Sequence, residues 1–367
     1  MSRFRIELAR NEDDSHIRRI LRENPMQGDI SLTFQREPNF FDSLVVEGRE
    51  NQVGVGREIK TSRVVGFGVR SIKPCFVNSE VKNLGYISGL RLDEEFRGST
   101  LIPRGYKFFR ELHQDGKTKM YLTTIVEDNL PAREMLTSGR AGLPAYHDFG
   151  AYITYAVNIQ RKRNKRAKIE IRRANSEDLS AIVEFLHREG RKKQFYPVYE
   201  TSDFSDLGLL RGMTPKDILL AVDSGVIIGT LAKWDQREFK QTVVNSYNGK
   251  MRAMRHIYNL FAPLFHRSRL VREGEALSFV YAGLLSTVNN NPEIFRSLLD
   301  RAHDELTESG FSQLMVGLHE RDPLNAVMQD FSSIKFRTRL YVVSWQDGED
   351  SFKQLDTKVP YLELGSL

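Results

Sequence analysis

Apolar and polar residues recur along the chain at two spacings, one typical of strands and one typical of helices. Residues 4–8 alternate between the two kinds, as in a strand with one buried face, and Asn11 is a polar cap for the helix expected next. Farther on, residues 101–113 have a helical spacing, and the ranges 86–92 and 119–126 predict strands on either side of that helix. Strands in antiparallel order between helices predict an α+β fold with mixed, mainly antiparallel sheets.

This pattern occurs twice. Residues 4–21 align with residues 169–186 at a constant shift of 165, without a gap and with seven identities in eighteen positions. The identical pairs are Ile6/Ile171, Ala9/Ala174, Glu12/Glu177, Asp13/Asp178, Ser15/Ser180, Ile17/Ile182 and Leu21/Leu186. Three later runs match at changing shifts, as insertions in loops would produce: Val64–Gly68 with Ile227–Leu231, Ile87–Leu90 with Tyr281–Leu284, and Thr154–Val157 with Leu340–Val343. The chain is therefore predicted to hold two similar domains.

The repeat defines the predicted domain boundaries. We expect an N-terminal domain at residues 1–159, a basic linker at 160–168, a C-terminal domain at 169–346 and a tail at 347–367.

The second copy is longer than the first, which predicts an inserted helical segment at residues 235–273. Pro263 is expected to bend or end its helix. An apolar stripe follows the helical spacing and comprises Met251, Met254, Ile257, Tyr258, Phe261, Leu264 and Phe265. We expect the chain's own domains to cover this stripe, with a homodimer seam or another partner as the alternatives.

Composition narrows the class of protein. Hydrophobic residues make up 40% of the 367 residues and charged residues 28%, which excludes a wholly disordered chain and a coiled coil. No stretch approaches the roughly 18 apolar residues of a membrane span, so we expect a cytoplasmic protein without a membrane partner. The single cysteine, Cys75, excludes an internal disulfide and a zinc site built on several thiolates, and we expect it to be a packing residue.

Basic residues are concentrated in two short runs. Residues 160–173 carry eight Lys or Arg and one Glu, and residues 250–272 carry six Lys or Arg and no acid. Together these runs exceed the net charge of +6, so the rest of the chain is net acidic. The first run lacks interleaved aromatic residues, as a solvated linker does, and nucleic-acid binding therefore ranks last among the functions considered.

The strand at 86–92 ends in a turn with the composition of an anion-binding site. Between it and the helix at 101–113 lie Arg97, Gly98, Ser99 and Thr100. Such a turn offers backbone amides and the positive end of the helix dipole to a pyrophosphate. The alternative is a plain strand-to-helix turn in which Arg97 pairs with Glu94 or Glu95.

These residues resemble a known family. The run Leu-x-Leu-Asp-x-x-Phe-Arg-Gly at 90–98, and a following strand that ends in Asn-x-x-Ala at 129–132, are similar to the acyl-CoA-binding core of GCN5-related N-acetyltransferases, which have tandem relatives. The resemblance implies two tandem domains of that type and acetyl-CoA or another acyl-CoA as co-substrate. It implies that pantetheine contacts the backbone of Leu90, Arg91 and Leu92, that the pyrophosphate contacts Arg97, Gly98, Ser99 and Thr100, and that the far side of the cofactor contacts Asn129.

The chain departs from the family pattern in both copies. In the first, Thr100 and Ile102 stand where the family has small residues, and Leu136 stands where many members have a tyrosine that protonates the leaving thiolate. In the second, the Arg-Gly turn is absent. We therefore expect only the first domain to bind CoA, and the second to be a structural partner or to shape the substrate cleft. Asn129 has an alternative role as the cap of a helix that begins at Leu130 or Pro131.

The predicted function is transfer of an acetyl or other short acyl group from acyl-CoA to a primary amine of a small molecule or peptide. Glu127, at the end of the strand that faces the proposed thioester, is the predicted base, acting directly or through water, and its alternative role is that of a solvated acid at a strand end. The alternative function is a non-catalytic CoA-binding or protein-interaction module. No motif in the sequence predicts a metal site.

Overall fold

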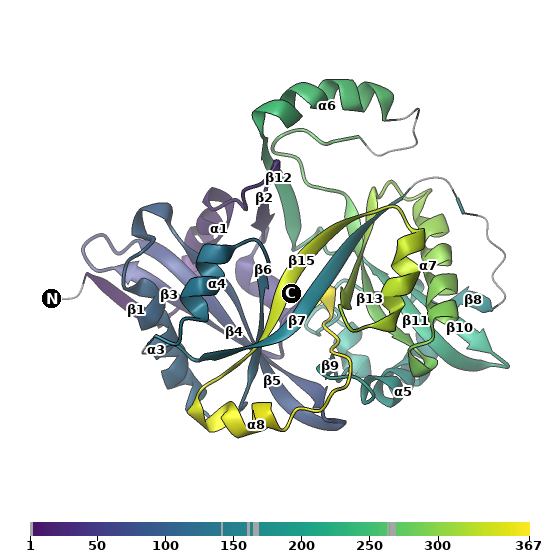
Figure 1. Ribbon diagram of the computed structural model, residues 1–367, viewed down its shortest axis with the longest axis horizontal. Helices are drawn as coiled ribbons and strands as arrows, with labels where there is room; N and C mark the ends of the chain where they lie inside the picture. The colour runs from purple at the N-terminus through teal and green to yellow at the C-terminus, as the bar shows by residue number, and fades with distance from the viewer. Residues whose placement is uncertain (1–2, 141, 160–161, 164–168, 263, 265–268) are drawn as a thin grey trace.

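A computed structural model describes residues 3–140, 142–159, 162–163, 169–262, 264 and 269–367 (Figure 1). Most of the predicted linker at 160–168 lies outside these residues, and so does Pro263. The described chain alternates strands and helices, as an α+β fold does. Its N-terminal end lies at one side of the molecule and its C-terminal end lies near the middle.

The elements of the first half include several with the predicted bounds. β1 spans Phe4–Leu8 and α3 spans Leu101–His113, both as predicted. Asn11 begins a short 3₁₀ turn that precedes α1, so it does not cap that helix. The other elements are α1 (Asp14–Glu23), β2 (Ile30–Gln35), α2 (Phe40–Ser43), β3 (Glu50–Glu58), β4 (Val64–Val77), β5 (Glu80–Leu92), β6 (Tyr121–Val126), α4 (Leu130–Leu136) and β7 (Ala145–Asn158).

The second half repeats the order of the first. In place of α4 it has the 3₁₀ helix at Pro323–Asp330. Its elements are β8 (Glu170–Arg173), α5 (Leu179–Gly190), β9 (Tyr196–Pro197), β10 (Ile218–Asp223), β11 (Val226–Trp234), β12 (Gln241–Tyr247), α6 (Gly249–Phe261), β13 (Phe279–Thr287), α7 (Pro292–Leu306), β14 (Gln313–His319), β15 (Ser333–Ser344) and α8 (Glu349–Lys353).

One mixed sheet runs through both halves. Its strand order is β1-β3-β4-β5-β6-β15-β7-β14-β13-β11-β10-β8. Read inward from its two edges, the sheet has β1-β3-β4-β5-β6 on one side and β8-β10-β11-β13-β14 on the other. These strands correspond one to one, and the pairs β5/β6 and β13/β14 are both parallel whereas their neighbours are antiparallel. The repeated fold predicted from the sequence is therefore present.

The two halves exchange their last strands. β7, the last strand of the first half, pairs with β14 of the second half, and β15, the last strand of the second half, pairs with β6 of the first. The two pairings have the same register. Thr154 and Leu340 are equivalent in the repeat, and Thr154 lies opposite Gly317 as Leu340 lies opposite Thr124. β15 and β7 also pair with each other, which makes the sheet continuous. Each half thus completes its sheet with a strand from the other.

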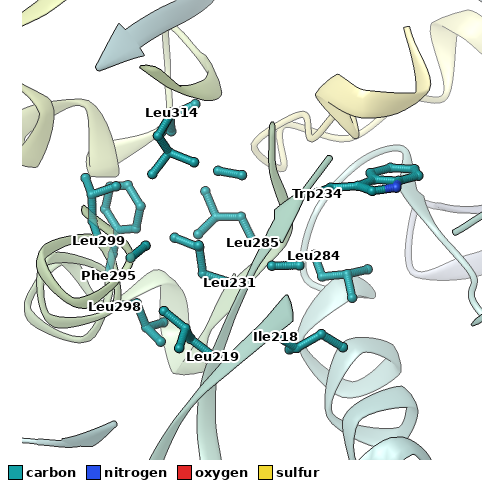
Figure 2. Packing of buried hydrophobic residues seen from close by; sticks show 14 of the residues in the cluster. Ile218, Leu219, Leu231, Trp234, Leu284, Leu285, Phe295, Leu298, Leu299 and Leu314 are labelled. Carbon is teal, nitrogen blue, oxygen red and sulfur yellow. The ribbon is translucent and has the colours of Figure 1, made fainter. Parts of the chain in front are cut away.

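The largest apolar core lies in the second half. Figure 2 shows Leu231 and Leu285 of the sheet beside Phe295 and Leu298 of α7, and all four are at most 1% exposed. A Cβ atom on Gly229 would lie 2.6 Å from Ile294 and 3.0 Å from Leu298, so this glycine lets α7 approach the sheet closely. The apolar clusters of the first half are smaller. The second half therefore holds the larger apolar core, and buried polar groups occur in both halves.

The inserted segment at 235–273 is not helical throughout. It begins with β12, which forms a separate two-stranded antiparallel sheet with β2 of the first half. α6 follows and projects from the body (Figure 1), and the expectation that the chain's own domains cover its stripe is wrong. Met254, Ile257, Leu260, Phe261 and Leu264 are between 46% and 71% exposed. Among the described residues, no helix is long and apolar enough to cross a membrane.

Candidate active site

β5 and β6 separate in the middle of the sheet. Their parallel pairing is confined to Gly85 with Tyr121 and Tyr86 with Leu122. β5 then continues along β4 to Leu92. Beyond Tyr86 the backbone of β5 therefore has no strand on its β6 side, although the carbonyl of Leu90 accepts Arg91 Nη1 at 3.1 Å. The predicted pantetheine contacts Leu90, Arg91 and Leu92 lie in this separated part.

A bulge lies at the start of the separated part of β5. Gly89 and Leu90 together oppose Gly68 of β4, which shifts the register of the pair. Gly89 has φ +66°, and a Cβ atom there would lie 3.0 Å from the ring of Phe67. Glycine is therefore favoured at this position. Among the described residues, no side chain accepts a hydrogen bond from the amides of Gly89 or Leu90.

The second half has the same bulge one residue away from where the sequence alignment put it. Leu284 and Leu285 together oppose Leu231, and Leu284 has φ +51°. Gly89 therefore corresponds to Leu284 and not to Gly283. The corrected alignment also makes Tyr281 the counterpart of Tyr86, and burial raises the pKa of each hydroxyl to about 12.

The bulge of the second half is occupied by the predicted tail. The amide of Leu284 donates to Glu363 Oε2 at 2.9 Å, and the amide of Leu285 donates to Tyr361 Oη at 3.3 Å. Tyr361 also donates to Glu363 at 2.9 Å, and burial raises the pKa of the Glu363 carboxyl. The tail thus places side-chain oxygens at the second bulge. At the first bulge, formed by Gly89 and Leu90, no side chain among the described residues takes that place.

The turn after β5 is anchored through a buried acid. Asp93 is 4% exposed and accepts hydrogen bonds from Arg19 and Arg63. Gly98, farther along, has φ +78° and faces open space, since a Cβ atom there would have no neighbour within 4 Å. Arg97 donates to Glu94 at 3.3 Å and to Asn24 at 3.2 Å, so the pairing foreseen as the alternative is present.

The N-terminus of α3 adjoins this turn and has no side-chain cap. The amide of Leu101 makes a long contact of 3.4 Å with Ser99 Oγ, and Thr100 is exposed. The pKa of Arg91 is lowered by burial and by the positive charge of Arg97, so two guanidinium groups are close enough to repel each other. An open helix N-terminus beside two such cations is suited to a phosphate group.

The other two predicted site residues have structural partners. The Asn129 side chain accepts the amide of Ala132 at 3.3 Å and caps α4, which was its alternative role. Glu127 accepts a hydrogen bond from Arg337 at 2.7 Å and lies 3.8 Å from Arg339, both on β15. The roles of Glu127 as base and of Asn129 as a cofactor contact stay predictions.

A carboxylate that the sequence did not single out lies beside the bulge. Glu47 follows the 3₁₀ turn Leu44–Val46, and its side chain is 2% exposed. Its Oε2 accepts the hydroxyl of Ser88 at 2.7 Å, and its Oε1 accepts Arg36 Nη2 at 2.9 Å. Ser88 directly precedes Gly89 on β5. The only signal in the sequence was an acid next to the apolar run Leu44–Val46, which is too common to identify a site.

A small apolar cavity lies between α3 and the sheet. It has a volume of about 30 Å³. Five glycines line it, together with Leu90 and Leu92 of β5: Gly54, Gly56, Gly66, Gly68 and Gly105. A cavity of this volume holds a small group and not a long acyl chain.

In the described part of the chain, no group of three or more His, Cys, Asp or Glu side chains is placed to hold a metal ion.

Comparison with known proteins identifies the fold. No protein-family model and no curated protein sequence matches this chain. Among solved structures, Saccharomyces cerevisiae N-myristoyltransferase with bound myristoyl-CoA matches 94% of this chain and 79% of its own, with 12% identity and a TM-score of 0.61. A GCN5-related glucosamine N-acetyltransferase region of a fungal multi-domain GH3 beta-N-acetylglucosaminidase matches 92% of this chain and 38% of its own, with 14% identity and a TM-score of 0.61.

A third solved structure, the GCN5-related N-acetyltransferase from Anabaena variabilis ATCC 29413, matches 92% of this chain and 72% of its own, with 10% identity and a TM-score of 0.53. The class defined by the sheet and its separated strands is thus the acyl-CoA N-acyltransferase fold. The protein has this fold in a tandem arrangement, consistent with its likeness to N-myristoyltransferase.

Proposed function

We propose that the protein transfers an acetyl or other short acyl group from acyl-CoA to a primary amine, and that the first half holds the CoA. The observation that carries this proposal is the contrast between the two bulges. The amides of Leu284 and Leu285 have oxygen acceptors from side chains of the tail, whereas no side chain among the described residues accepts from the amides of Gly89 and Leu90. The small cavity beside Leu90 supports a short acyl group.

The co-substrate follows the backbone of β5 in this proposal. Pantetheine runs along the separated segment at Leu90–Leu92, where the backbone has no β6 partner. The pyrophosphate binds at Arg97 and Gly98 and at the open N-terminus of α3. The thioester oxygen then faces the amides at the bulge, which stabilise the negative charge that develops on it.

Glu47 is the proposed base, acting through the hydroxyl of Ser88. The amine nitrogen attacks the thioester carbonyl carbon, a C–N bond forms, and the C–S bond breaks with release of the CoA thiolate. The proton of the amine passes to Ser88 while the Ser88 hydroxyl proton passes to Glu47, as the 2.7 Å hydrogen bond between them allows. The second half shapes the acceptor site and binds no CoA.

Calorimetric titration with acetyl-CoA and with longer acyl-CoAs tests this proposal. We expect one acetyl-CoA per chain and weaker binding as the acyl chain lengthens. Arg97→Glu should weaken acetyl-CoA binding by about 1 to 3 kcal/mol, because it removes a charge-assisted contact to phosphate. Gly98→Val should also weaken binding, because a side chain would enter the open space at the turn.

Two matched variants serve as controls. Arg296 of α7 is a partly exposed arginine paired with Asp330, and Arg296→Glu should leave binding unchanged. Gly116 has φ +69° and open space around it, so Gly116→Val introduces the same kind of backbone strain away from the site. Unchanged binding in both Arg97→Glu and Gly98→Val would move the CoA site elsewhere.

A non-catalytic interaction module is the second candidate, and the exposed stripe of α6 favours it. The two candidates differ in turnover. Release of free CoA thiol that depends on an added amine supports the transferase. Acetyl-CoA binding without amine-dependent release across a wide set of amines would support the module.

A further inference from the structure

Three cations gather near the proposed base. Arg36 directly follows β2 and Lys240 directly precedes β12, and the pairing of Gln35 with Gln241 makes the two cations neighbours at the end of this small sheet. Lys73 lies on β4, on the same face as Val69, which opposes Ser88. The loop that carries Glu47 rests against β4, since a Cβ atom on the next residue, Gly48, would lie 2.8 Å from the backbone nitrogen of Ile72.

These three side chains have more N–H donors than hydrogen-bond acceptors around them. Arg36 uses Nη2 for Glu47, but its buried Nη1 has no hydrogen-bond acceptor. Lys240 donates to the main-chain oxygens of Gly365 and Leu367. Lys73 has no hydrogen bond or ion pair in the described part of the chain. Burial lowers the pKa of both lysines, and Arg36 and Lys73 lower that of Lys240 further.

The nearby acids have other partners, although one oxygen remains without any. Glu47 is bound by Arg36 and Ser88, and Asp203 accepts Arg49 at 3.0 Å. Glu363 accepts the amide of Leu284 through Oε2, while its buried Oε1 has no hydrogen-bond partner. Partly buried donors without an acceptor are costly, and an anion that accepts from them removes that cost. Lys73 and Lys240 are each partly exposed, so an anion from solution can reach them.

We propose that the amine acceptor is an amino acid whose carboxylate binds to Arg36 and Lys73. The inference rests on the proposed transferase function. The two terminal nitrogens of one guanidinium lie side by side, so a carboxylate on Nη1 of Arg36 lies next to the Glu47 carboxylate on Nη2. An acceptor held this way presents its amine at Ser88 only when amine and carboxylate are one or two carbons apart. α-Amino and β-amino acids meet that requirement.

Matched pairs of amines test the inference with the full chain and acetyl-CoA. Glycine is compared with ethanolamine, and β-alanine with 3-amino-1-propanol, by following release of CoA thiol. The members of each pair share their length and amine but differ in the carboxylate. A charge-assisted hydrogen bond implies about a 10- to 100-fold higher kcat/KM for the amino acid of at least one pair.

Variants of Lys73 separate binding of the carboxylate from general damage. Lys73→Met should raise the KM for the preferred amino acid about 10-fold or more and change that for the matched amino alcohol by less than about twofold. Lys73→Arg keeps the charge and should restore most of the preference. Lys82, an exposed lysine paired with Glu80 at the start of β5, supplies the control Lys82→Met, which should behave as the wild type.

The outcomes distinguish this inference from the function on which it rests. Absence of acetyl-CoA binding in the calorimeter would refute the transferase itself. Binding of acetyl-CoA with equal use of both members of each pair, or with no use of either, would overturn the amino-acid acceptor. An equal rise in KM for amino acid and amino alcohol in Lys73→Met would also overturn it, because the lysine would then have a structural role.

Discussion

Two carboxylates are candidates for the base, and they differ in what holds them. The Glu47 side chain is 2% exposed and contacts Ser88, the residue before the bulge. The Glu127 side chain is 29% exposed and is held by Arg337 at the end of β6. Both carboxylates are paired with an arginine, but Glu47 also contacts Ser88 beside the bulge, near the carbon that reacts in the proposal.

Substitution of each acid by its amide distinguishes the two candidates. Glu47→Gln keeps the hydrogen-bonding shape and should lower kcat by about 100-fold or more while acetyl-CoA affinity stays the same. Glu127→Gln is the matched control and should change kcat by less than about threefold. Steady-state kinetics measures both. A large loss in Glu127→Gln, with Glu47→Gln still active, would return the role of base to Glu127.

His319 makes the stability of the fold depend on pH. Its ring is 1% exposed, Nε2 donates to the carbonyl of Phe149 at 2.8 Å, and Nδ1 accepts the amide of Arg321 at 3.2 Å, which suits the neutral ring. Burial lowers the pKa of His319 below its usual value near 6.5. As the pH falls, this imidazole therefore binds a proton at a higher pH in the unfolded chain than in the folded protein. Stability is complete above about pH 6.5 and falls by at most about 1.4 kcal/mol per pH unit below it.

Urea unfolding between pH 7.5 and 5 measures this loss. His319→Gln retains a donor for the Phe149 carbonyl and cannot be protonated, so its stability should fall less steeply over that range. His16→Gln removes an exposed ring and should keep the wild-type profile. Identical slopes for His319→Gln and the wild type would show that another group carries the dependence.

At the scale of elements, the tail is part of the second half and not an appendage. Glu363 is 2% exposed and accepts the amide of Leu284 at the second bulge. Glu363→Ala would leave that buried amide without a partner and should destabilise the protein by about 1 to 3 kcal/mol. Thermal or urea unfolding measures the change, and calorimetry should still find one acetyl-CoA per chain, because the Arg-Gly turn is absent from this half.

The raised pKa of Glu363 also predicts how the stability of the protein depends on pH. An acid that is harder to ionise in the folded protein costs stability as the pH rises above its unfolded value. Glu363→Gln keeps an oxygen for Leu284 and cannot ionise, so its stability relative to the wild type should rise from pH 5 to pH 8. A second acetyl-CoA site in either variant would contradict the assignment of CoA to the first half.

Elements with local signals were predictable, and those that depend on distant partners were not. β1 and α3 have the predicted bounds, because alternation and helical spacing are written in neighbouring residues. β2 and β12 were missed, since each is a strand only through its pairing with the other across the two halves. The alignment of Gly89 with Gly283 was off by one, because a positive φ at Leu284 is invisible in a non-glycine residue.

The candidate site likewise contains residues that the sequence predicted and residues that it did not predict. The turn at Arg97 and Gly98 was found because a strand, a glycine and a helix follow one another along the chain. Glu47, Arg36 and Lys240 were not found, since long-range packing brings them together from separate segments. The occupant of the second bulge is 79 residues from Leu284 and was equally out of reach.

At the scale of the whole molecule, the exchanged strands make each half dependent on the other. Residues 1–159 alone would expose both edges left by β15, the strand that pairs with β6 and with β7. Unpaired strand edges promote aggregation. We therefore expect residues 1–159 to be insoluble or to aggregate when expressed alone, and to be soluble and bind acetyl-CoA when co-expressed with residues 169–367.

Size-exclusion chromatography of the separate and co-expressed fragments measures this dependence. Co-expression with residues 169–332, which lack β15, is the matched control and should fail to solubilise the first half. A monomeric, soluble fragment 1–159 with full acetyl-CoA affinity would show that the exchange is dispensable.

The exchange also determines the order of events during synthesis. Arg337 of β15 lies 210 residues after its partner Glu127, so β6 leaves the ribosome well before the strand that pairs with it. At about 5 to 20 residues per second, β6 waits for roughly 10 to 40 s. The nascent first half must keep its open edges apart from other chains during that interval. We therefore expect the yield of this protein to depend on translation speed and on chaperone supply.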